Sequence, residues 1–111
     1  MLSLTTIEVD LLKLLEAKNL FVRCLKRGQD GLIIKKHCWA DYPERGFHRD
    51  EVRLLLEGKG RLTLNRFPSA KPDSFLWCCL DKTGKAVQIA VVLDEGKIVA
   101  YAISAFRKPK K

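Results

Sequence analysis

Residues 74–106 read SFLWCCLDKTGKAVQIAVVLDEGKIVAYAISAF, and this stretch decides the fold. Three apolar segments alternate with two short turns that contain glycine, Asp81 to Lys85 and Asp94 to Lys97. Such segments favour β-strands, and turns this short permit only antiparallel pairing, because a parallel crossover needs about a dozen residues or more. The stretch therefore predicts a meander of three antiparallel strands, the last of which ends at Phe106.

A further strand is expected upstream, from Arg61 to Phe67, followed by a loop from Pro68 to Pro72. The segment from Leu20 to Arg27 alternates in part between apolar and other residues. Leu32 to Lys36 reads as a returning strand after a turn at Gly28 to Gly31. Turn residues between two such segments favour a β-hairpin. The alternative is that part of this region is an irregular connection.

Two segments carry the signals of helices. The first is expected from Thr6 to Lys18, opens with a capping-box pattern, can be closed by Asn19, and has an apolar stripe of Ile7, Leu11, Leu14 and Leu15. The second is expected from Arg49 to about Glu57, has acidic residues in its first turn, ends at Gly58, and buries Val52, Leu55 and Leu56.

Helices followed by a meander of strands favour the α+β class. We expect two helices packed on one face of a twisted, mainly antiparallel sheet of about four to six strands. A length of 111 residues supports a single domain. This domain would comprise an N-terminal helix over 1–19, an α+β core over 20–106 and a basic tail over 107–111.

The chain carries 21 Lys and Arg against 13 Asp and Glu, a net charge of +8. Such a charge favours an anionic partner, and nucleic acid is the commonest one. No apolar run approaches the roughly 18–20 residues of a membrane span. The first residues lack the basic start of a signal peptide. We therefore expect a small cytoplasmic protein that does not engage a membrane.

The spacing of the cysteines indicates neither a metal site nor a redox motif. None of them lies in a C-x-x-C motif or at zinc-ligand spacing from a histidine, and we interpret all four as reduced thiols: Cys24, Cys38, Cys78 and Cys79. The sequence also lacks the motifs of P-loops, serine hydrolases, zinc hydrolases and dinucleotide sites. The sequence therefore predicts no metal and no cofactor.

The only two histidines, His37 and His48, bracket a segment that also holds Arg45. RNA cleavage without a metal needs a base for the 2′-hydroxyl proton, an acid for the leaving 5′-oxygen and cations around the phosphate. Histidine suits the first two roles because it titrates near neutrality, and arginine suits the third through its bidentate fork. Structural interpretations stay open: His48 as a helix N-cap, His37 as a strand end, and Arg45 and Arg49 as solvated charge.

The order of these residues resembles a known pattern. His37 is followed by Glu44-Arg-Gly-Phe47, then by a helix of Glu-Val-x-x-x-Leu type that ends at Gly58, then by strands. Over about Ile33 to Phe106, this arrangement resembles an uncharacterised prokaryotic domain family grouped with the RelE-like and colicin-type endoribonuclease folds. That group includes many toxins of toxin–antitoxin pairs, so the resemblance implies helices followed by an antiparallel sheet, and an acidic antitoxin-like partner.

The resemblance places His37 and Arg45 at the family's characteristic polar positions, and Ser104 at a small hydroxyl position in the last strand. Two positions depart from the pattern. Asp41 stands where many members carry Arg, which reverses a charge beside the supposed phosphate site, and His48 replaces the usual Ser or Thr cap. The first helix lies outside the match, and we expect a monomer or a homodimer formed through it.

These observations support three hypotheses. The first is a metal-free endoribonuclease of toxin type that uses His37, Arg45, His48 and Ser104 and contacts RNA through Lys35, Lys36, Arg49, Arg53, Arg66, Arg107 and Lys108. The second is a non-catalytic module on the same fold that binds nucleic acid or protein. The third is an interaction protein without a nucleic-acid role. Tyr101 and Phe106 in the last strand are expected to be packing residues rather than a base-stacking platform.

Overall fold

The computed structural model describes residues 6–40, 46–65 and 74–107. Its two α-helices are α1 (Thr6–Lys26) and α2 (Arg49–Glu57), and two short 3-10 helices are η1 (Gly28–Asp30) and η2 (Lys36–Cys38). The strands are β1 (Leu32–Ile34), β2 (Arg61–Leu64), β3 (Ser74–Leu80), β4 (Ala86–Asp94) and β5 (Val99–Arg107). They form one five-stranded sheet in the order β1-β5-β4-β3-β2.

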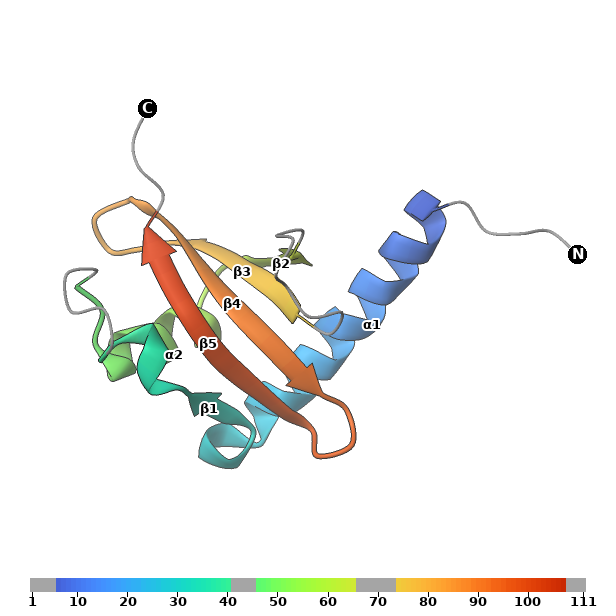
Figure 1. Ribbon diagram of the computed structural model, residues 1–111, viewed down its shortest axis with the longest axis horizontal. Coiled ribbons are helices and arrows are strands. Elements are labelled where there is room, and N and C mark those ends of the chain that lie inside the picture. The colour runs from blue at the N-terminus through green and yellow to red at the C-terminus, as the bar shows by residue number, and fades with distance from the viewer. Residues whose placement is uncertain (1–5, 41–45, 66–73, 108–111) are drawn as a thin grey trace, which may run out of the picture.

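The sheet is mixed, and both α-helices lie on the same side of it (Figure 1). The neighbouring pairs β2–β3, β3–β4 and β4–β5 are antiparallel, whereas β1 runs parallel to β5. Residues of both helices and of the strands share one buried cluster, which includes Phe21, Val52, Leu56, Trp77 and Ile89. The predicted α+β class, with two helices on one face of a mainly antiparallel sheet, is therefore confirmed.

The predicted meander and the second helix are also confirmed. The strands β3, β4 and β5 begin and end within one or two residues of the expected positions, and α2 spans Arg49–Glu57 as expected. Phe47 and Val52 lie on either side of the first turn of α2, at the two positions of a hydrophobic staple, and both are buried. The amphipathic pattern of this helix therefore corresponds to its packing against the sheet.

The prediction of a hairpin from residue 20 onward was wrong. Residues 20–26 continue α1, and β1 pairs in parallel with β5, with Ile33 opposite Tyr101. Phe21 and Cys24 lie on the same helical face as Ala17, and all three are buried in the core. Burial of this face against the sheet stabilises the helix over a segment whose alternation also fits a strand.

The first half of α1 projects beyond the sheet (Figure 1). Its leucine stripe is accordingly not part of the core: Leu11 is 61% exposed and Leu15 is 57% exposed. Only Leu14 of this group packs in part against the core cluster. The buried face of α1 belongs to its second half, which lies under the strands.

Small residues on β5 allow this close packing. Ala100, Ala102 and Ala105 are fully buried on the side of the helices. A β-bulge between Ala90 and Val91 of β4 shifts the register of β5, so the alanines stay on the inner side although their spacing changes. The two aromatic side chains of β5, Tyr101 and Phe106, consequently point to the opposite side of the sheet.

Three side chains make four long-range hydrogen bonds that hold the helices to the sheet. Arg27, just after α1, donates to the carbonyl oxygens of Lys97 and Ile98 at 2.6 and 2.9 Å. The indole Nε1 of Trp77 donates to the Leu55 carbonyl at 2.8 Å. Arg53 donates to the carbonyl of Leu32 in β1 at 3.1 Å. Within the described parts of the chain, no helix combines the length and apolar character needed to cross a membrane.

Candidate nucleic-acid interface

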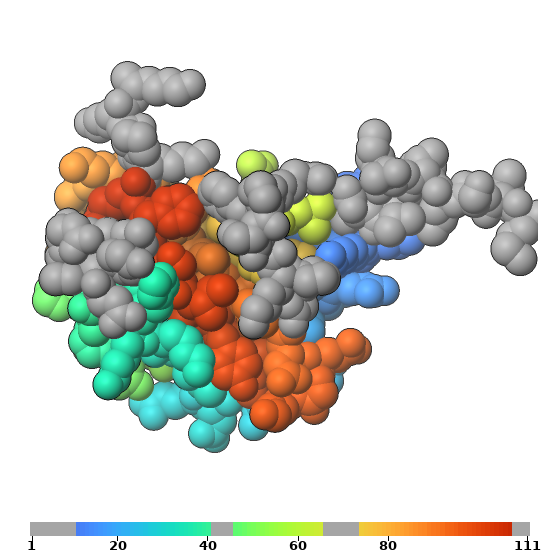
Figure 2. Space-filling view, in the orientation of Figure 1, coloured from blue at the N-terminus to red at the C-terminus, as the bar shows by residue number. Residues whose placement is uncertain are grey.

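The face of the sheet turned away from the helices carries half-exposed side chains. In register, Ile33 of β1 lies beside Tyr101 of β5, which lies beside Val92 of β4. Ser104 and Phe106 follow on the same side of β5, opposite Ala90 and Gln88 of β4. We call Ile33, Val92, Tyr101, Ser104 and Phe106 the outer face. Figure 2 shows β4 and β5 side chains at the surface of this side, with residues of the η2 region beside them.

A lysine stands over the aromatic ring at the centre of this face. The Nζ of Lys35 lies 5.2 Å from the centroid of the Tyr101 ring. The backbone of Lys35 is fixed, because its N–H donates to the Ala102 carbonyl at 2.9 Å. Its side chain is exposed and Tyr101 is half-buried. The arrangement places a cation and an aromatic face together at the surface, which is the chemistry that contacts a phosphate and a neighbouring base.

The candidate catalytic residues lie on elements that adjoin each other. His37 is exposed on η2, and η2 packs against β5, the strand that carries Ser104. His48 and Arg49 are exposed at the start of α2, which contacts η2. Lys36 is exposed beside His37. Arg45, Arg66 and Lys108 lie outside the described residues, so the roles predicted for them at the site stay predictions.

His48 is the N-cap residue of α2, as its structural interpretation proposed, but only through its backbone. The His48 carbonyl accepts the N–H of Val52 at 3.1 Å, which makes His48 the N-cap residue of α2. Its imidazole makes no capping hydrogen bond to this helix. The side chain is exposed.

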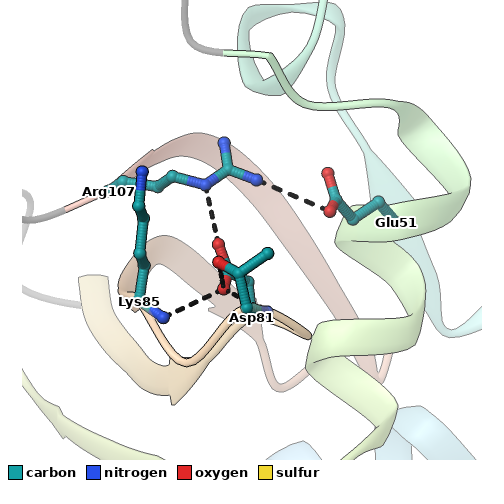
Figure 3. Close-up of polar contacts among 5 residues, drawn as sticks. Glu51, Asp81, Lys85 and Arg107 are labelled. Carbon is teal, nitrogen blue, oxygen red and sulfur yellow. Dashed lines mark hydrogen bonds and ion pairs between the residues drawn. The ribbon is translucent and has the colours of Figure 1, made fainter.

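Arg53 and Arg107 make contacts within the protein that stabilise the fold, although both were predicted to contact RNA. Arg53 bonds the Leu32 carbonyl as described above. Arg107 was expected to begin a basic tail, but it is the last residue of β5. Its Nε donates to Oδ2 of Asp81 at 2.9 Å, and its Nη2 lies 3.5 Å from Oε2 of Glu51 (Figure 3).

Asp81 is the centre of this cluster. Its Oδ1 accepts hydrogen bonds from the Thr83 hydroxyl at 2.6 Å, from the Thr83 N–H at 2.9 Å and from the Lys85 N–H at 3.0 Å. The Thr83 hydroxyl and then Arg107 hold the pKa of the Asp81 carboxyl well below its usual value. Arg107 also stacks over the Phe47 ring at 4.2 Å, so one guanidinium joins the β3–β4 turn, β5 and the start of α2.

The four cysteines form no disulfide and are reduced thiols, as predicted, and Cys78 and Cys79 point to opposite faces of β3. Burial raises the pKa of the Cys79 thiol to about 11, and burial also raises the pKa of Cys24. Both thiols are therefore neutral at physiological pH and poorly suited to act as nucleophiles. Among the residues that the structure describes, no group of three or more His, Cys, Asp or Glu is placed to hold a metal ion.

Tyr101 and Phe106 were predicted to be packing residues, and the pairing of Tyr101 with Lys35 was not predicted. Both aromatic residues lie outside the core cluster. The signal was present in the spacing of the alanines, because strand residues two apart share a face and Ala100 and Ala102 flank Tyr101. A strand that turns alanine toward the helices must turn its aromatic residues to the other side.

Comparison with known proteins adds no relative to this picture. No protein-family model, no curated protein sequence and no solved structure matches the chain.

Proposed function

We propose that this protein binds single-stranded RNA on the outer face of its sheet. The observation that carries the proposal is the position of Lys35 over the Tyr101 ring, on the face of β5 opposite its buried alanines. A base that stacks on Tyr101 would displace the exposed Lys35 ammonium from the ring, and its phosphate would then lie within reach of Lys35 and Lys36. Stacking on an aromatic ring contributes about 1–3 kcal/mol per base and needs bases that are unpaired, which favours single strands over duplexes.

The net charge of +8 supports the same proposal. Lys35, Lys36, His48 and Arg49 are all exposed on elements that adjoin β5 or η2. Phosphate contacts by such side chains release counterions, so the affinity would fall with salt. Arg53 and Arg107 are left out of the proposed interface, because each already bonds groups that position α2.

The test is fluorescence anisotropy with a labelled single-stranded RNA of mixed sequence. Tyr101→Leu keeps the apolar volume but removes the ring, and we expect roughly a tenfold or greater loss of affinity. Tyr101→Phe should bind within about twofold of wild type, because the stacking surface is retained. Lys35→Gln should weaken binding and reduce the salt dependence.

Lys26→Gln is the matched charge control, because Lys26 is an exposed residue at the end of α1, on the other side of the sheet. It should leave the affinity close to wild type. Unchanged RNA affinity in Tyr101→Leu, or equal losses in Lys26→Gln and Lys35→Gln, would reject the outer face as the binding site.

A second candidate function is metal-independent cleavage of the bound RNA. It is favoured by the exposed position of His37 on η2, which packs against the strand that carries Ser104. In this reaction the 2′-oxygen bonds to phosphorus and the bond from phosphorus to the 5′-oxygen breaks. One of His37 and His48 would accept the 2′-hydroxyl proton and the other would donate a proton to the 5′-oxygen. The products would be a 2′,3′-cyclic phosphate and a 5′-hydroxyl.

A further inference from the structure

The turn between α2 and β2 separates two adjoining grooves. One groove, of about 670 Å³, lies between Leu54 and Leu80. The other, of about 390 Å³, lies between Val22 of α1 and the β2–β3 edge. Both are lined by Gly58, Gly60 and Arg61, so they form one continuous surface. We call this surface, with its two grooves, the 58–61 surface.

Large aliphatic side chains are exposed along this surface. Leu54 is 70% exposed, Leu80 is 64% exposed and Val22 is 49% exposed. Single exposed apolar residues are ordinary, but a cluster along a groove is typical of a binding surface. Aliphatic residues do not offer stacking faces to bases, and the one tryptophan that lines the surface, Trp77, is only 9% exposed. The chemistry therefore favours a protein ligand over RNA.

The charges on the 58–61 surface have one sign. Its charged lining residues are Lys18, Lys59 and Arg61, all basic. Glu57, next to the turn, lines neither groove. A third groove, between α1 and the sheet, is different because both signs line it: Lys13, Arg23, Glu16 and Glu95. The uniform charge of the 58–61 surface is complementary to a ligand with carboxylates beside its apolar side chains.

The residues at the base of the 58–61 surface, Gly60 and Trp77, are held in place by contacts within the protein itself. A Cβ on Gly60 would collide with the indole of Trp77, so the turn can lie this close only with glycine at that position. The Trp77 ring is held by its hydrogen bond to Leu55 and by Phe21, whose ring centroid is 5.2 Å away. A preformed groove binds with less ordering of its own residues, which favours affinity.

We propose that the 58–61 surface docks an amphipathic acidic segment of a partner protein. Aliphatic side chains of that segment would pack between Leu54 and Leu80 and against Val22. Its Asp or Glu side chains would face Lys18, Lys59 and Arg61. This site uses none of the residues of the outer face, so the partner and the RNA are proposed for different surfaces of the same domain.

The test uses a pair of labelled peptides of about 18 residues, long enough for about five helical turns. Both carry leucines at helical spacing; one has glutamate at its polar positions and the other has lysine at the same positions. Anisotropy with the full-length protein should show at least roughly tenfold tighter binding of the glutamate peptide, and this preference should shrink as salt is raised.

Variants then locate the binding. Leu54→Ser and Leu80→Ser change exposed side chains, so the fold should be kept, and each should weaken the glutamate peptide at least about fivefold. Arg61→Gln should also weaken it. Leu12→Ser is the matched apolar control, because Leu12 is 49% exposed and lines neither groove. It should bind like wild type.

Three results would overturn the proposal. The first is equal binding of the two peptides, or binding that Leu54→Ser leaves unchanged. The second is self-association, seen by sedimentation velocity, that Leu54→Ser abolishes, because the surface would then belong to a second copy of the chain. The third is loss of RNA affinity, rather than peptide affinity, in Arg61→Gln and Leu54→Ser. Tyr101→Leu changes only RNA binding on this account, so the two proposals can fail separately.

Discussion

Asp81 combines a buried carboxylate with four hydrogen bonds, and this has a consequence for acid stability. Its side chain is 3% exposed and accepts from Thr83, Lys85 and Arg107. Because these donors lower the folded-state pKa from its ordinary value of 3.8, the stability that Asp81 contributes is present above about pH 4. It is lost as the pH falls below that value toward the folded-state pKa.

We therefore expect Asp81→Asn to be less stable than wild type at pH 7, with a difference that narrows between about pH 4 and pH 2. Urea unfolding followed by tryptophan fluorescence measures both proteins across this range. Asp30→Asn is the control, because Asp30 is an exposed carboxylate on η1. It should follow wild type at every pH. A difference for Asp81→Asn that stays constant with pH would contradict the role given to its charge.

A second prediction at the residue scale concerns His37. If the protein cleaves RNA, His37→Ala should reduce the cleavage rate by about 10²–10⁴-fold while it leaves RNA affinity nearly unchanged, because proton transfer acts in the transition state. Arg45→Ala should reduce both quantities, since a cation at the phosphate acts before and during the reaction. EDTA should have no effect. The measurement is a fluorogenic RNA oligomer, with buffer alone as the control.

Wild-type protein that binds RNA without cleaving it would leave only the binding function. Cleavage that survives His37→Ala and His48→Ala would instead reject histidine as the source of the proton transfers. Tyr101→Leu separates the two steps further, because it should lower cleavage only at RNA concentrations that do not saturate the protein.

At the scale of elements, local signals predicted the sheet meander and α2, whose apolar patterns match their packing. The second half of α1 could not be predicted in this way. Leu20, Val22 and Cys24 suggest alternation, whereas Ala17, Phe21 and Cys24 recur at helical spacing, and both patterns are present in the same residues. Contact of Phe21 with Trp77, far along the chain, favours the helix.

The candidate site was predictable only in part. Basic residues near the histidines were visible in the sequence, but their roles depend on long-range contacts. Arg107 could not be distinguished from the lysines that follow it until Asp81 and Glu51 were placed beside it. Lys35 meets Tyr101 because β1 pairs in parallel with β5, and no local pattern indicates that pairing.

The connection from α1 to β1 yields a prediction about packing. A Cβ on Gly31 would collide with the carbonyl oxygen of Cys24, so the chain passes the last turn of α1 too closely for any side chain. Gly31→Ala should lower the free energy of unfolding by roughly 1–3 kcal/mol. Gly96→Ala is the control, since its Cβ would lie an ordinary 3.6 Å from Asp94, and it should change stability by less than about 0.5 kcal/mol. Equal urea midpoints for the two variants would contradict this packing.

At the scale of the whole molecule, we expect the positive charge of the last four residues to contribute to RNA binding but not to the stability of the fold. Deleting residues 108–111 removes three lysines and leaves Arg107 in its contacts with Asp81 and Glu51. We expect weaker RNA binding, a decrease in the salt slope of at most about 2, and an unchanged melting temperature. Replacing the same three lysines with glutamine should reproduce the binding defect. A large drop in melting temperature after the deletion would show that the last residues support the fold.

The parallel pairing of β1 with β5 also determines the order in which the chain can fold. The guanidinium of Arg27 bonds the carbonyl of Ile98, 71 positions later, and among the described strands β1 pairs only with β5. Hairpins closed by short turns form quickly, whereas such distant contacts form late. On a translating ribosome, α1 and β1 therefore emerge well before the strand that covers them. During that interval Phe21, Cys24 and Leu32 face water, and a chaperone that holds apolar segments would find its binding site there.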